Sequence, residues 1–574
     1  MRLISKKVGS VCLIPVGILI ILGAILAMAS LGLAMAQTRP PSRLPTQSSN
    51  PITLNMNLVT DPLTLDPALA WDTTSNFCIE QLFLGLTDFD DETMDVVPEL
   101  ATSWDISPTG LVYTFTLRSD AYWTDGHPVT AHDVEYSIKR ALDPATGSWL
   151  AYVLYIIENA EDFNKGVITD PDQVGVRAID DHHVEFTLEY PASYFLSILT
   201  MSIAKPVPRW AIEDYGEQWT EPENIVTNGP YRLTEWVRGD HMTFDKNPGF
   251  YAAANVQIER VNAVMVDAST AWDMYLNCQL DYTSPPLEEL DNIKADPVLS
   301  QQLHITPRLC TYYYGFSTDK PPFDNPLVRR AFSAAINRQG LIDDVLKGEQ
   351  QPANAFACPG IFGNVAGDPD IAPWALDYEQ GRSLAQQWLA EAGYPNGEGF
   401  PEVTLMHNTG AGHRAIAEYI AANWTEVLSV TVNITDMPWE EYFNLIKRCP
   451  SPDDKPHIWR LGWCADYPDQ NNWVYECFHS QYGANNICWY NEEFDTITSE
   501  AGAEADPNRR KTLYKRAEEI LCEEEAGIAP IYYYTNVLMV KPYLQRFYSG
   551  LNHIYKWRII FKVFLPIIMK QYAP

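Results

Sequence analysis

The sequence predicts an α/β fold divided into two or three domains. Apolar and polar residues alternate at 112–117, 184–188 and 242–244, with the period of two that is typical of strands. In other segments, apolar residues recur at helical spacing, at 131–141, 326–336, 379–392, 413–428 and 509–521. Helices that alternate with strands indicate sheets covered by helices. A chain of 574 residues is too long for one ordinary core, and its 46% of apolar residues can fill several.

The N-terminal 36 residues predict export. Residues 1–7 include three basic side chains, residues 11–36 are almost wholly apolar or small, and AMA at 34–36 fits the small-residue rule of signal peptidase. The apolar run is also long enough to span a bilayer, so an uncleaved anchor that holds the protein at the membrane is the alternative. Residues 37–50, rich in Pro, Ser and Thr, predict a flexible linker. The C-terminal tail at 562–574 is apolar and basic but too short to span a membrane.

The charge of the chain excludes nucleic acid as a default partner. The formal net charge is −34, and loss of residues 1–36 would remove Arg2, Lys6 and Lys7 and no acid, which makes it −37. Such a surface repels phosphate backbones. Most of these charges are expected to keep an exported protein soluble.

The segment RLGWCADY at 460–467 places a carboxylate and a guanidinium beside a cysteine in an aromatic, strand-like run. A buried carboxylate needs a cationic partner. If the chain supplies none for Asp466, a ligand ammonium is the natural candidate, and free peptides and amino acids carry one at pH 7. The alternative is that Asp466 caps a turn or pairs with a nearby Lys or Arg.

Motifs along most of the chain resemble one family. They are LDP (65–67), VYTFTLR (112–118), WTDG (123–126), VTA (129–131), IVTNGPY (225–231), KPPF (320–323) and IYYY (531–534). Their order and spacing over about 53–560 resemble the periplasmic oligopeptide-binding proteins, in solute-binding protein family 5 of peptide ABC importers.

The resemblance implies a bilobed periplasmic-binding-protein fold, type II-like, with an additional inserted domain and three domains in total. Domain I, in the first lobe, is expected at 51–90, 205–309 and 530–561. Domain II, inserted into it, is expected at 91–204, and domain III, the second lobe, at 310–529. The hinge would lie near Leu309 and Pro530.

The resemblance also implies roles for residues of the cleft. Gly462 and Cys464 match the strand that pairs with the backbone of a peptide, and Asp466 matches the aspartate that binds its α-ammonium group. Arg460 and His413 match positions that bind the peptide carboxylate. Backbone pairing is the same for every sequence, so it predicts a binder of many peptides.

Further residues are expected to shape the cleft. Trp439 and Trp463 resemble walls of side-chain pockets, and Thr73, with the two residues before it, lies where the first lobe meets the ligand. Gly315 departs from the family, in which oligopeptide binders carry a glutamate here, and this leaves the length and side-chain preference of the ligand open.

The cysteines predict disulfides and argue against a metal site. Nine of the ten cysteines remain after cleavage, and in an oxidising compartment an odd number implies a free thiol or an intermolecular bond. The family pattern supports a bond between Cys310 and Cys464, and proximity alone suggests Cys477 with Cys488. The sequence has neither paired CxxC motifs nor HExxH, so we expect no metal and no cofactor.

The function expected from the resemblance is that of a receptor rather than an enzyme. A monomer in the periplasm, or at the outer face of the cytoplasmic membrane, would capture oligopeptides and deliver them to the permease subunits of an ABC importer with cytoplasmic ATPase subunits. Alternatives with the same fold are a binder of dipeptides, oligosaccharides or metal complexes, or an exported peptide chaperone or sensor. An exported hydrolase would need a nucleophile or metal motif, and GxSxG and HExxH are absent.

Overall fold

The structure is a computed structural model that describes residues 51–91, 93–546 and 553–560. The expected signal peptide or anchor (1–36), the linker (37–50) and the tail (562–574) lie outside these residues. Within the described ranges, no helix combines the length and the apolar character needed to cross a membrane.

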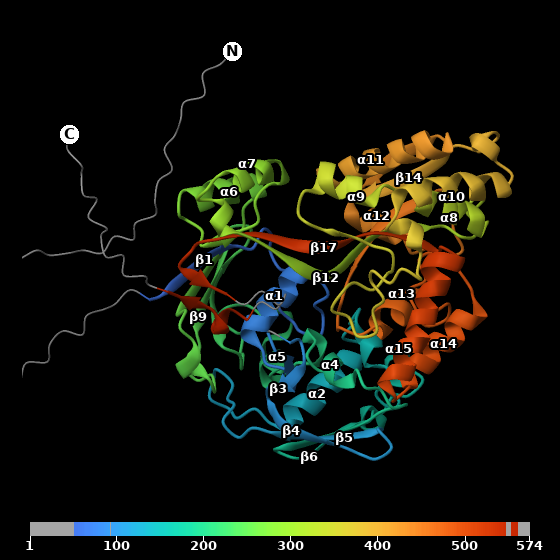
Figure 1. The fold of residues 1–574 in the computed structure, drawn as a ribbon. Helices are drawn as coiled ribbons and strands as arrows, with labels where there is room; N and C mark the ends of the chain where they lie inside the picture. The colour runs from blue at the N-terminus through green and yellow to red at the C-terminus, as the bar shows by residue number, and fades with distance from the viewer. Residues whose placement is uncertain (1–50, 92, 547–552, 561–574) are drawn as a thin grey trace, which may run out of the picture.

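One sheet of eleven strands runs through both lobes (Figure 1). Its order is β15-β14-β16-β12-β17-β11-β1-β10-β9-β8, and β13 pairs with β17 beside this path. The strands are β1 (Thr53–Asn57), β8 (Tyr231–Val237), β9 (His241–Lys246), β10 (Arg260–Val264), β11 (Tyr282–Thr283), β12 (Leu303–Phe316), β13 (Gln351–Pro352), β14 (Val403–Asn408), β15 (Val432–Met437), β16 (Ile458–Cys464) and β17 (Ile528–Val540).

The smaller sheets lie apart from this large sheet. A four-stranded sheet has the order β4-β5-β7-β6 and lies at the bottom of Figure 1. Its strands are β4 (Ala101–Ile106), β5 (Val112–Leu117), β6 (Val176–Asp180) and β7 (His183–Thr187). Two-stranded sheets are formed by β2 (Thr87–Phe89) with β3 (Val96–Pro98), and by β18 (Leu544–Gln545) with β19 (Arg558–Ile559).

Helices cover the sheets, as the α/β pattern predicts. They are α1 (Thr73–Leu82), α2 (Ala131–Leu142), α3 (Ala160–Asn164), α4 (Phe195–Ile198), α5 (Arg209–Tyr215), α6 (Ala268–Leu276), α7 (Leu290–Ala295), α8 (Pro326–Ala334), α9 (Arg338–Leu341), α10 (Tyr378–Glu391), α11 (Ala411–Leu428), α12 (Trp439–Ile446), α13 (Glu476–Phe478), α14 (Glu492–Ala503) and α15 (Pro507–Glu518). The five helices predicted from apolar spacing are all present, with ends within three residues of the prediction. Side-chain caps fix some of these ends: Asp377 accepts a hydrogen bond from Gln380 N at the start of α10.

The long strands β12 and β17 connect the two lobes. They pair antiparallel from Leu303 opposite Met539 to Gly315 opposite Ile528, and Figure 1 shows them side by side between the lobes. Their ladder is interrupted between Pro307 and Thr311. The interruption includes Leu309, where the hinge is predicted; the hinge and the domain bounds stay predictions.

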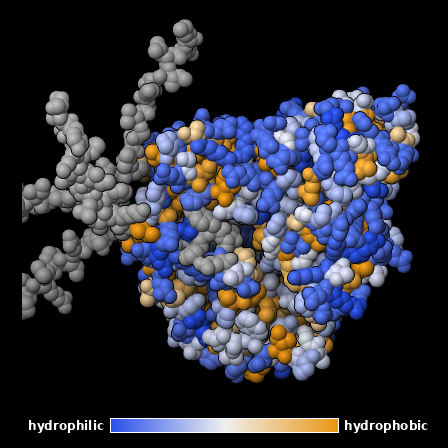
Figure 2. Space-filling model, in the orientation of Figure 1, coloured by the Kyte–Doolittle hydropathy of each residue, from blue (hydrophilic) through white to orange (hydrophobic). Residues whose placement is uncertain are grey.

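Hydrophobic clusters explain why the first lobe holds together as one body. A single cluster contains Val261 of the large sheet and Phe115 of the four-stranded sheet, so the predicted domains I and II share a core. In the second lobe, one cluster includes Trp424 of α11 and another includes Trp473. Hydrophilic residues cover most of the face drawn in Figure 2, as the strong net charge predicts.

The motifs that carry the family resemblance have structural roles. Asp66 of the LDP motif is buried and accepts two hydrogen bonds from the Arg140 guanidinium of α2, at 2.9 and 2.5 Å. It also accepts one from the Trp219 indole at 3.2 Å. A buried ion pair needs such additional partners, and this motif ties the segment before α1 to α2 and to the segment after α5.

The structure corrects one of the two expected disulfides. Cys310 is joined to Cys464, the pair that the resemblance implies. Cys488, however, is joined to Cys449, and Cys477 is a free, buried thiol in α13. The prediction of Cys477 with Cys488 was wrong because it used distance along the chain. The chain folds Cys477 into the core and brings Cys449, at the end of α12, to Cys488.

Candidate ligand-binding site

Strand β16 has one edge that is only partly paired. Its partner β12 runs alongside its whole length, with Cys310 opposite Cys464 and Tyr314 opposite Arg460. On the other side, β14 pairs only with the first two residues of β16, Ile458 and Trp459. Within the described part of the chain, the edge from 460 to 464 therefore has no strand beside it.

The hydrogen-bond pattern shows which peptide groups of β16 face this open edge. Ala465 N donates to Leu309 O of β12 at 2.9 Å. In an antiparallel pair, residues directed toward the partner alternate with residues directed away from it. Residues 461, 463 and 465 are therefore directed toward β12, and the N–H and C=O groups of Gly462 and Cys464 point to the open edge. An extended chain could add to this edge as a further strand.

The Arg460 guanidinium lies at one end of this edge and has no acid partner. Its side chain is 8% exposed, donates to Asn408 Oδ1 and to the Tyr534 hydroxyl, each at 2.9 Å, and lies 4.7 Å from the centre of the Tyr312 ring. Its Nε is buried without a hydrogen-bond partner. None of the ion pairs among the described residues includes Arg460. A buried cation without a counter-ion favours binding of an anion.

His413 lies in the first turn of α11, beside this guanidinium. Its ring centre is 5.8 Å from that of Tyr312, and its Nδ1 is 3.4 Å from the Tyr312 hydroxyl. Burial, Arg460 and His407 lower the pKa of His413 to about 3, so the ring is neutral in the empty protein. His407 is 1% exposed, and its Nε2 has no hydrogen-bond partner. The neutral imidazole of His413 thus lies next to the guanidinium, and the His407 ring centre lies 6.5 Å from that of His413.

Asp466 lies beyond the other end of β16, again without an opposite charge. Its carboxylate accepts a hydrogen bond from Asn472 Nδ2 at 3.0 Å, and its backbone N–H donates to Asn472 Oδ1. Across the described ranges, no ion pair includes this carboxylate. Burial raises the pKa of Asp466 to about 6, opposed by the hydrogen bond from Asn472. The interpretation that Asp466 pairs with a Lys or Arg is therefore wrong for the described residues.

A second carboxylate, not predicted from the sequence, lies beside Asp466. Glu476 accepts hydrogen bonds of 2.6 Å from Asn472 Nδ2 and from the Tyr467 hydroxyl. Burial raises the pKa of Glu476 to about 8, with the negative charge of Asp466 acting in the same direction. Tyr152, from the first lobe, has its pKa raised by burial and then by Glu476 and Asp466. The anionic end of the site thus holds Asp466, with Glu476 behind Asn472.

Aromatic residues from both lobes meet in a row. The Trp71 ring is 5.7 Å from Trp149, Trp149 is 6.1 Å from Phe443, and Phe443 stacks at 5.4 Å on Trp439. Trp439 is 41% exposed, so it is not an ordinary core tryptophan. Phe443 and Trp439 belong to α12 of the second lobe, so this row connects the lobes.

The other predicted residues have simpler roles. Trp463 is partly buried and donates from its indole to Asn472 Oδ1 at 3.3 Å, which links it to the Asp466 end. Thr73 is the first residue of α1, where Asp72 caps the helix by accepting from Thr74 N and Ser75 N.

Gly315 is explained by a buried tryptophan. A Cβ at this position would lie 2.3 Å from Trp459 Cζ2, far inside van der Waals contact. The Trp459 ring therefore fills the space in which a larger residue at 315 would place its side chain.

The comparison with known proteins gives the family. Residues 95–485 match the family described as "Bacterial extracellular solute-binding proteins, family 5 Middle". The chain belongs to this family. The periplasmic oligopeptide-binding protein OppA of Escherichia coli (strain K12) is 33% identical over 502 residues, which cover 86% of this chain and 89% of that protein. As a member of an extracellular family, the protein is exported.

Solved structures of the same family share the fold. The murein tripeptide binding protein MppA of Escherichia coli superposes with a TM-score of 0.77 and 30% identity, covering 89% of this chain and 99% of that one. Haemophilus influenzae OppA, in complex with RPPGFSPFR, gives a TM-score of 0.75 at 28% identity, and the match covers 90% of this chain and 100% of that one. The bilobed, three-domain α/β fold predicted from the sequence is confirmed.

The structure groups the predicted residues into two sets along β16. Arg460 and His413 form one, and Asp466 and Trp463 form the other; the open-edge residues Gly462 and Cys464 lie on β16 between Arg460 and Asp466. The sequence did not indicate His407, Asn408, Asn472, Glu476, Tyr152 or Tyr534. Asn472 and Glu476 follow Asp466 by six and ten residues, but nothing in that spacing shows that they turn back toward it. Within the described residues no cluster of three His, Cys, Asp or Glu could hold a metal ion.

Proposed function

We propose that this family 5 protein is the receptor of an ABC importer for oligopeptides. A peptide lies along the open edge of β16 and pairs with the backbone of Gly462 and Cys464. Its α-ammonium group meets Asp466, and its carboxylate meets Arg460 and His413. The side chains of the peptide contact Trp439, Trp463 and the region of Thr73.

The observation that carries this proposal is the pair of uncompensated charges at the two ends of one open strand edge. A free peptide offers the two complementary charges and, between them, a backbone that can pair with a strand. Each charge-assisted hydrogen bond of this kind contributes about 1.5 to 3 kcal/mol.

The spacing of the two charges limits the length of the peptide. Asp466 follows Arg460 by six residues, and at roughly 3.3 Å per residue an extended strand of this length covers about 20 Å. A peptide with its ammonium at Asp466 runs antiparallel to β16. We infer that about five or six residues can reach both charges, and that shorter peptides reach only one of them.

The receptor acts as a monomer and delivers its ligand by docking on permease subunits driven by cytoplasmic ATPases. The closing motion is a rotation of the lobes about β12 and β17, the kind of hinge motion known for periplasmic binding proteins. Contacts between the lobes support this: Tyr194 stacks on Tyr467 at 5.6 Å, and Arg510 Nη1 donates to Ser193 Oγ at 2.6 Å. The protein has no catalytic role in this proposal.

Calorimetry with capped peptides tests the proposed termini directly. One pentapeptide is titrated in four forms: free, N-acetylated, C-amidated and capped at both ends. We expect each single cap to weaken binding by more than tenfold, because it leaves one buried charge of the protein without its partner. Equal affinity for all four forms would refute the proposal.

Three half-exposed tryptophans favour a second candidate ligand, an oligosaccharide. Its sugar rings would stack on Trp71, Trp149 and Trp439. A neutral sugar would leave both Arg460 and Asp466 without a counter-charge. Titration with cello- and xylo-oligosaccharides in the same calorimeter separates the two candidates. Binding of a sugar, with no binding of free peptides, would establish the second.

A further inference from the structure

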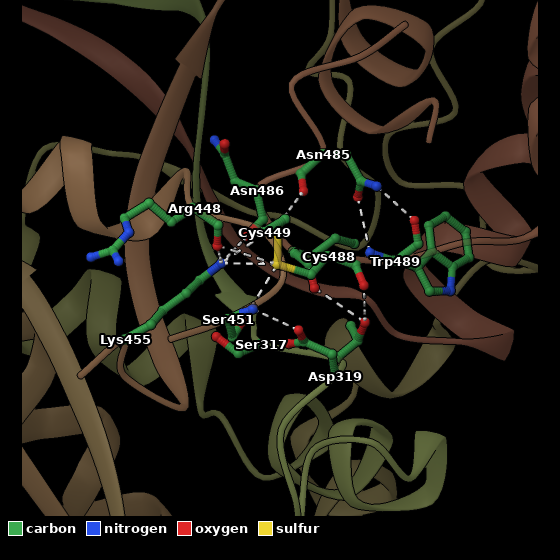
Figure 3. Close-up of a disulfide and its surroundings, with 12 residues drawn as sticks. Ser317, Asp319, Arg448, Cys449, Ser451, Lys455, Asn485, Asn486, Cys488 and Trp489 are labelled. Atoms are coloured by element: carbon green, nitrogen blue, oxygen red, sulfur yellow. Dashed lines mark hydrogen bonds between the residues drawn. A yellow bond between two sulfur atoms is a disulfide. The ribbon is translucent and has the colours of Figure 1, made fainter. Parts of the chain in front are cut away.

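A second disulfide joins Cys449 to Cys488 (Figure 3). Cys449 is exposed and follows the C-terminal end of α12, and Cys488 lies in a turn before α14. A reagent in solution can therefore approach Cys449 Sγ, whereas Cys488 is partly buried behind it.

The Lys455 ammonium is buried against this disulfide. Its side chain is 1% exposed, and its Nζ lies 3.2 Å from Cys488 Sγ and 3.9 Å from Cys449 Sγ. Figure 3 shows it directed at the two sulfur atoms. Its other partners are carbonyl oxygens, Asn486 O at 2.7 Å and Arg448 O at 3.1 Å. In the described ranges, no carboxylate forms an ion pair with Lys455.

The other charged groups nearby have partners of their own. Asp319 accepts from Ser451 N at 2.7 Å, and Lys320 donates to backbone carbonyls, including Lys455 O at 2.5 Å. Arg448 is half exposed and lies 4.0 Å from Asp454. Burial and then the positive charge of Lys320 lower the pKa of Lys455 to about 8, against the opposing effect of Asp319. The ammonium is thus mostly charged at pH 7 and is the cation closest to the sulfurs.

The bond between Cys310 and Cys464 provides an internal comparison. Cys310 is buried in β12 and Cys464 is exposed, and the described residues include no lysine, arginine or histidine that donates a hydrogen bond to either sulfur of this disulfide. Cys449–Cys488 and Cys310–Cys464 therefore differ in a feature that matters for exchange, a cation beside one sulfur.

We propose that Cys449–Cys488 is a thiol–disulfide exchange site for dithiol reductants, including dithiol oxidoreductases of the exported compartment. A thiolate of the reductant attacks the exposed Cys449 Sγ. A new sulfur–sulfur bond forms there, the bond to Cys488 breaks, and Cys488 leaves as a thiolate beside the Lys455 ammonium. The second thiol of the reductant then attacks its own mixed-disulfide sulfur and releases Cys449 as a thiolate, so the protein is reduced and the reductant oxidised to its disulfide.

The direction of attack follows from exposure and charge. Exchange is faster when the leaving thiol has the lower pKa, and a neighbouring ammonium lowers the pKa of a thiol. Lys455 is closer to Cys488 than to Cys449, so Cys488 is the better leaving group. Accessibility selects Cys449 as the sulfur that is attacked.

The first experiment uses the unaltered protein. It is incubated with dithiothreitol at pH 7 for increasing times, alkylated and mapped by mass spectrometry, so that Cys449–Cys488 and Cys310–Cys464 are followed in one sample. We expect the Cys449–Cys488 bond to be reduced at least about tenfold faster than Cys310–Cys464. The rate for Cys449–Cys488 divided by the rate for Cys310–Cys464 should fall between pH 7 and 9, because Lys455 loses its proton. Ionisation of the reagent changes both rates equally, so it does not affect this ratio. Equal rates at all pH values would overturn the proposal.

The second experiment locates the attacked sulfur and the role of the lysine. With the monothiol glutathione, we expect the mixed disulfide on Cys449; glutathione mainly on Cys488 would refute the direction of attack. Lys455→Met should slow reduction by about tenfold, and Lys455→Arg, which keeps the charge, should restore part of the rate. Lys447→Met, which removes an exposed lysine nearby, is the matched control and should leave the rate unchanged.

Discussion

Replacing Asp466 by Asn should stabilise the empty protein and weaken peptide binding at the same time. Burial raises the pKa of Asp466 from its ordinary 3.8 to about 6, so the charged form is disfavoured in the folded state. Two pKa units correspond to about 3 kcal/mol at most, and because the side chain is partly accessible to water we expect a stabilisation of about 1 to 2 kcal/mol. Asparagine is isosteric and can still accept the hydrogen bond from Asn472.

The sign of the pH dependence follows from this shift. As pH rises above 3.8, the unfolded chain loses this proton before the folded protein does, so the folded state loses stability until pH passes about 6. The advantage of Asp466→Asn should therefore be full at pH 7.5 and shrink to about a third at pH 4.5.

Thermal unfolding and calorimetry measure both effects. A domain of 150 to 250 residues shifts its midpoint by about 2 to 4 °C per kcal/mol, so the empty variant should melt ~4 °C higher at pH 7.5. Its affinity for a free pentapeptide should fall by more than tenfold, because the ammonium loses its charged partner. Asp454→Asn, an exposed control in the same lobe, should change neither quantity. A variant that loses stability and affinity together would refute the reasoning and assign Asp466 a structural role.

Three further predictions follow from the site. Arg460→Met should weaken the free pentapeptide by more than tenfold but leave its C-amidated form unchanged in calorimetry, and equal losses would contradict a carboxylate contact. Peptide affinity should fall by up to about tenfold per pH unit below pH 6, because Asp466 must release a proton to bind an ammonium, and this slope should vanish in Asp466→Asn. Gly315→Ala should lower the free energy of unfolding by about 1 to 3 kcal/mol, and with it the melting midpoint, because its Cβ overpacks against Trp459. Adding Trp459→Leu should recover part of the lost stability.

Periodicity was sufficient to find the regular elements of this fold. The predicted strand at 112–117 has the bounds of β5, and the predicted helix at 131–141 is α2 almost residue for residue. Such elements are set by contacts between near neighbours along the chain, such as the hydrogen bond from Thr130 N to the Asp133 carboxylate at the start of α2. The order of the strands in the large sheet was beyond this reasoning, because β12 and β17 pair across more than two hundred residues.

The site shows the same division. Asp466 and Arg460 could be selected from the sequence because each is a charge within an aromatic, strand-like run. Glu476 and His407 could not, since each reaches the site only when a helix or a neighbouring strand folds against β16. The wrong pairing of Cys477 has the same origin, because a position in the buried interior is not visible in spacing along the chain.

By itself, the sequence determined the α/β class, the export of the protein, its family and the two charges that anchor the proposed ligand. These depend on residue type and local order, which the chain carries directly. Only the tertiary structure decided that neither charge has an opposite partner among the described residues, that the edge of β16 between them is open, and that Lys455 lies against the disulfide of Cys449. These are properties of distance and burial, and they arise when segments far apart in the chain pack together.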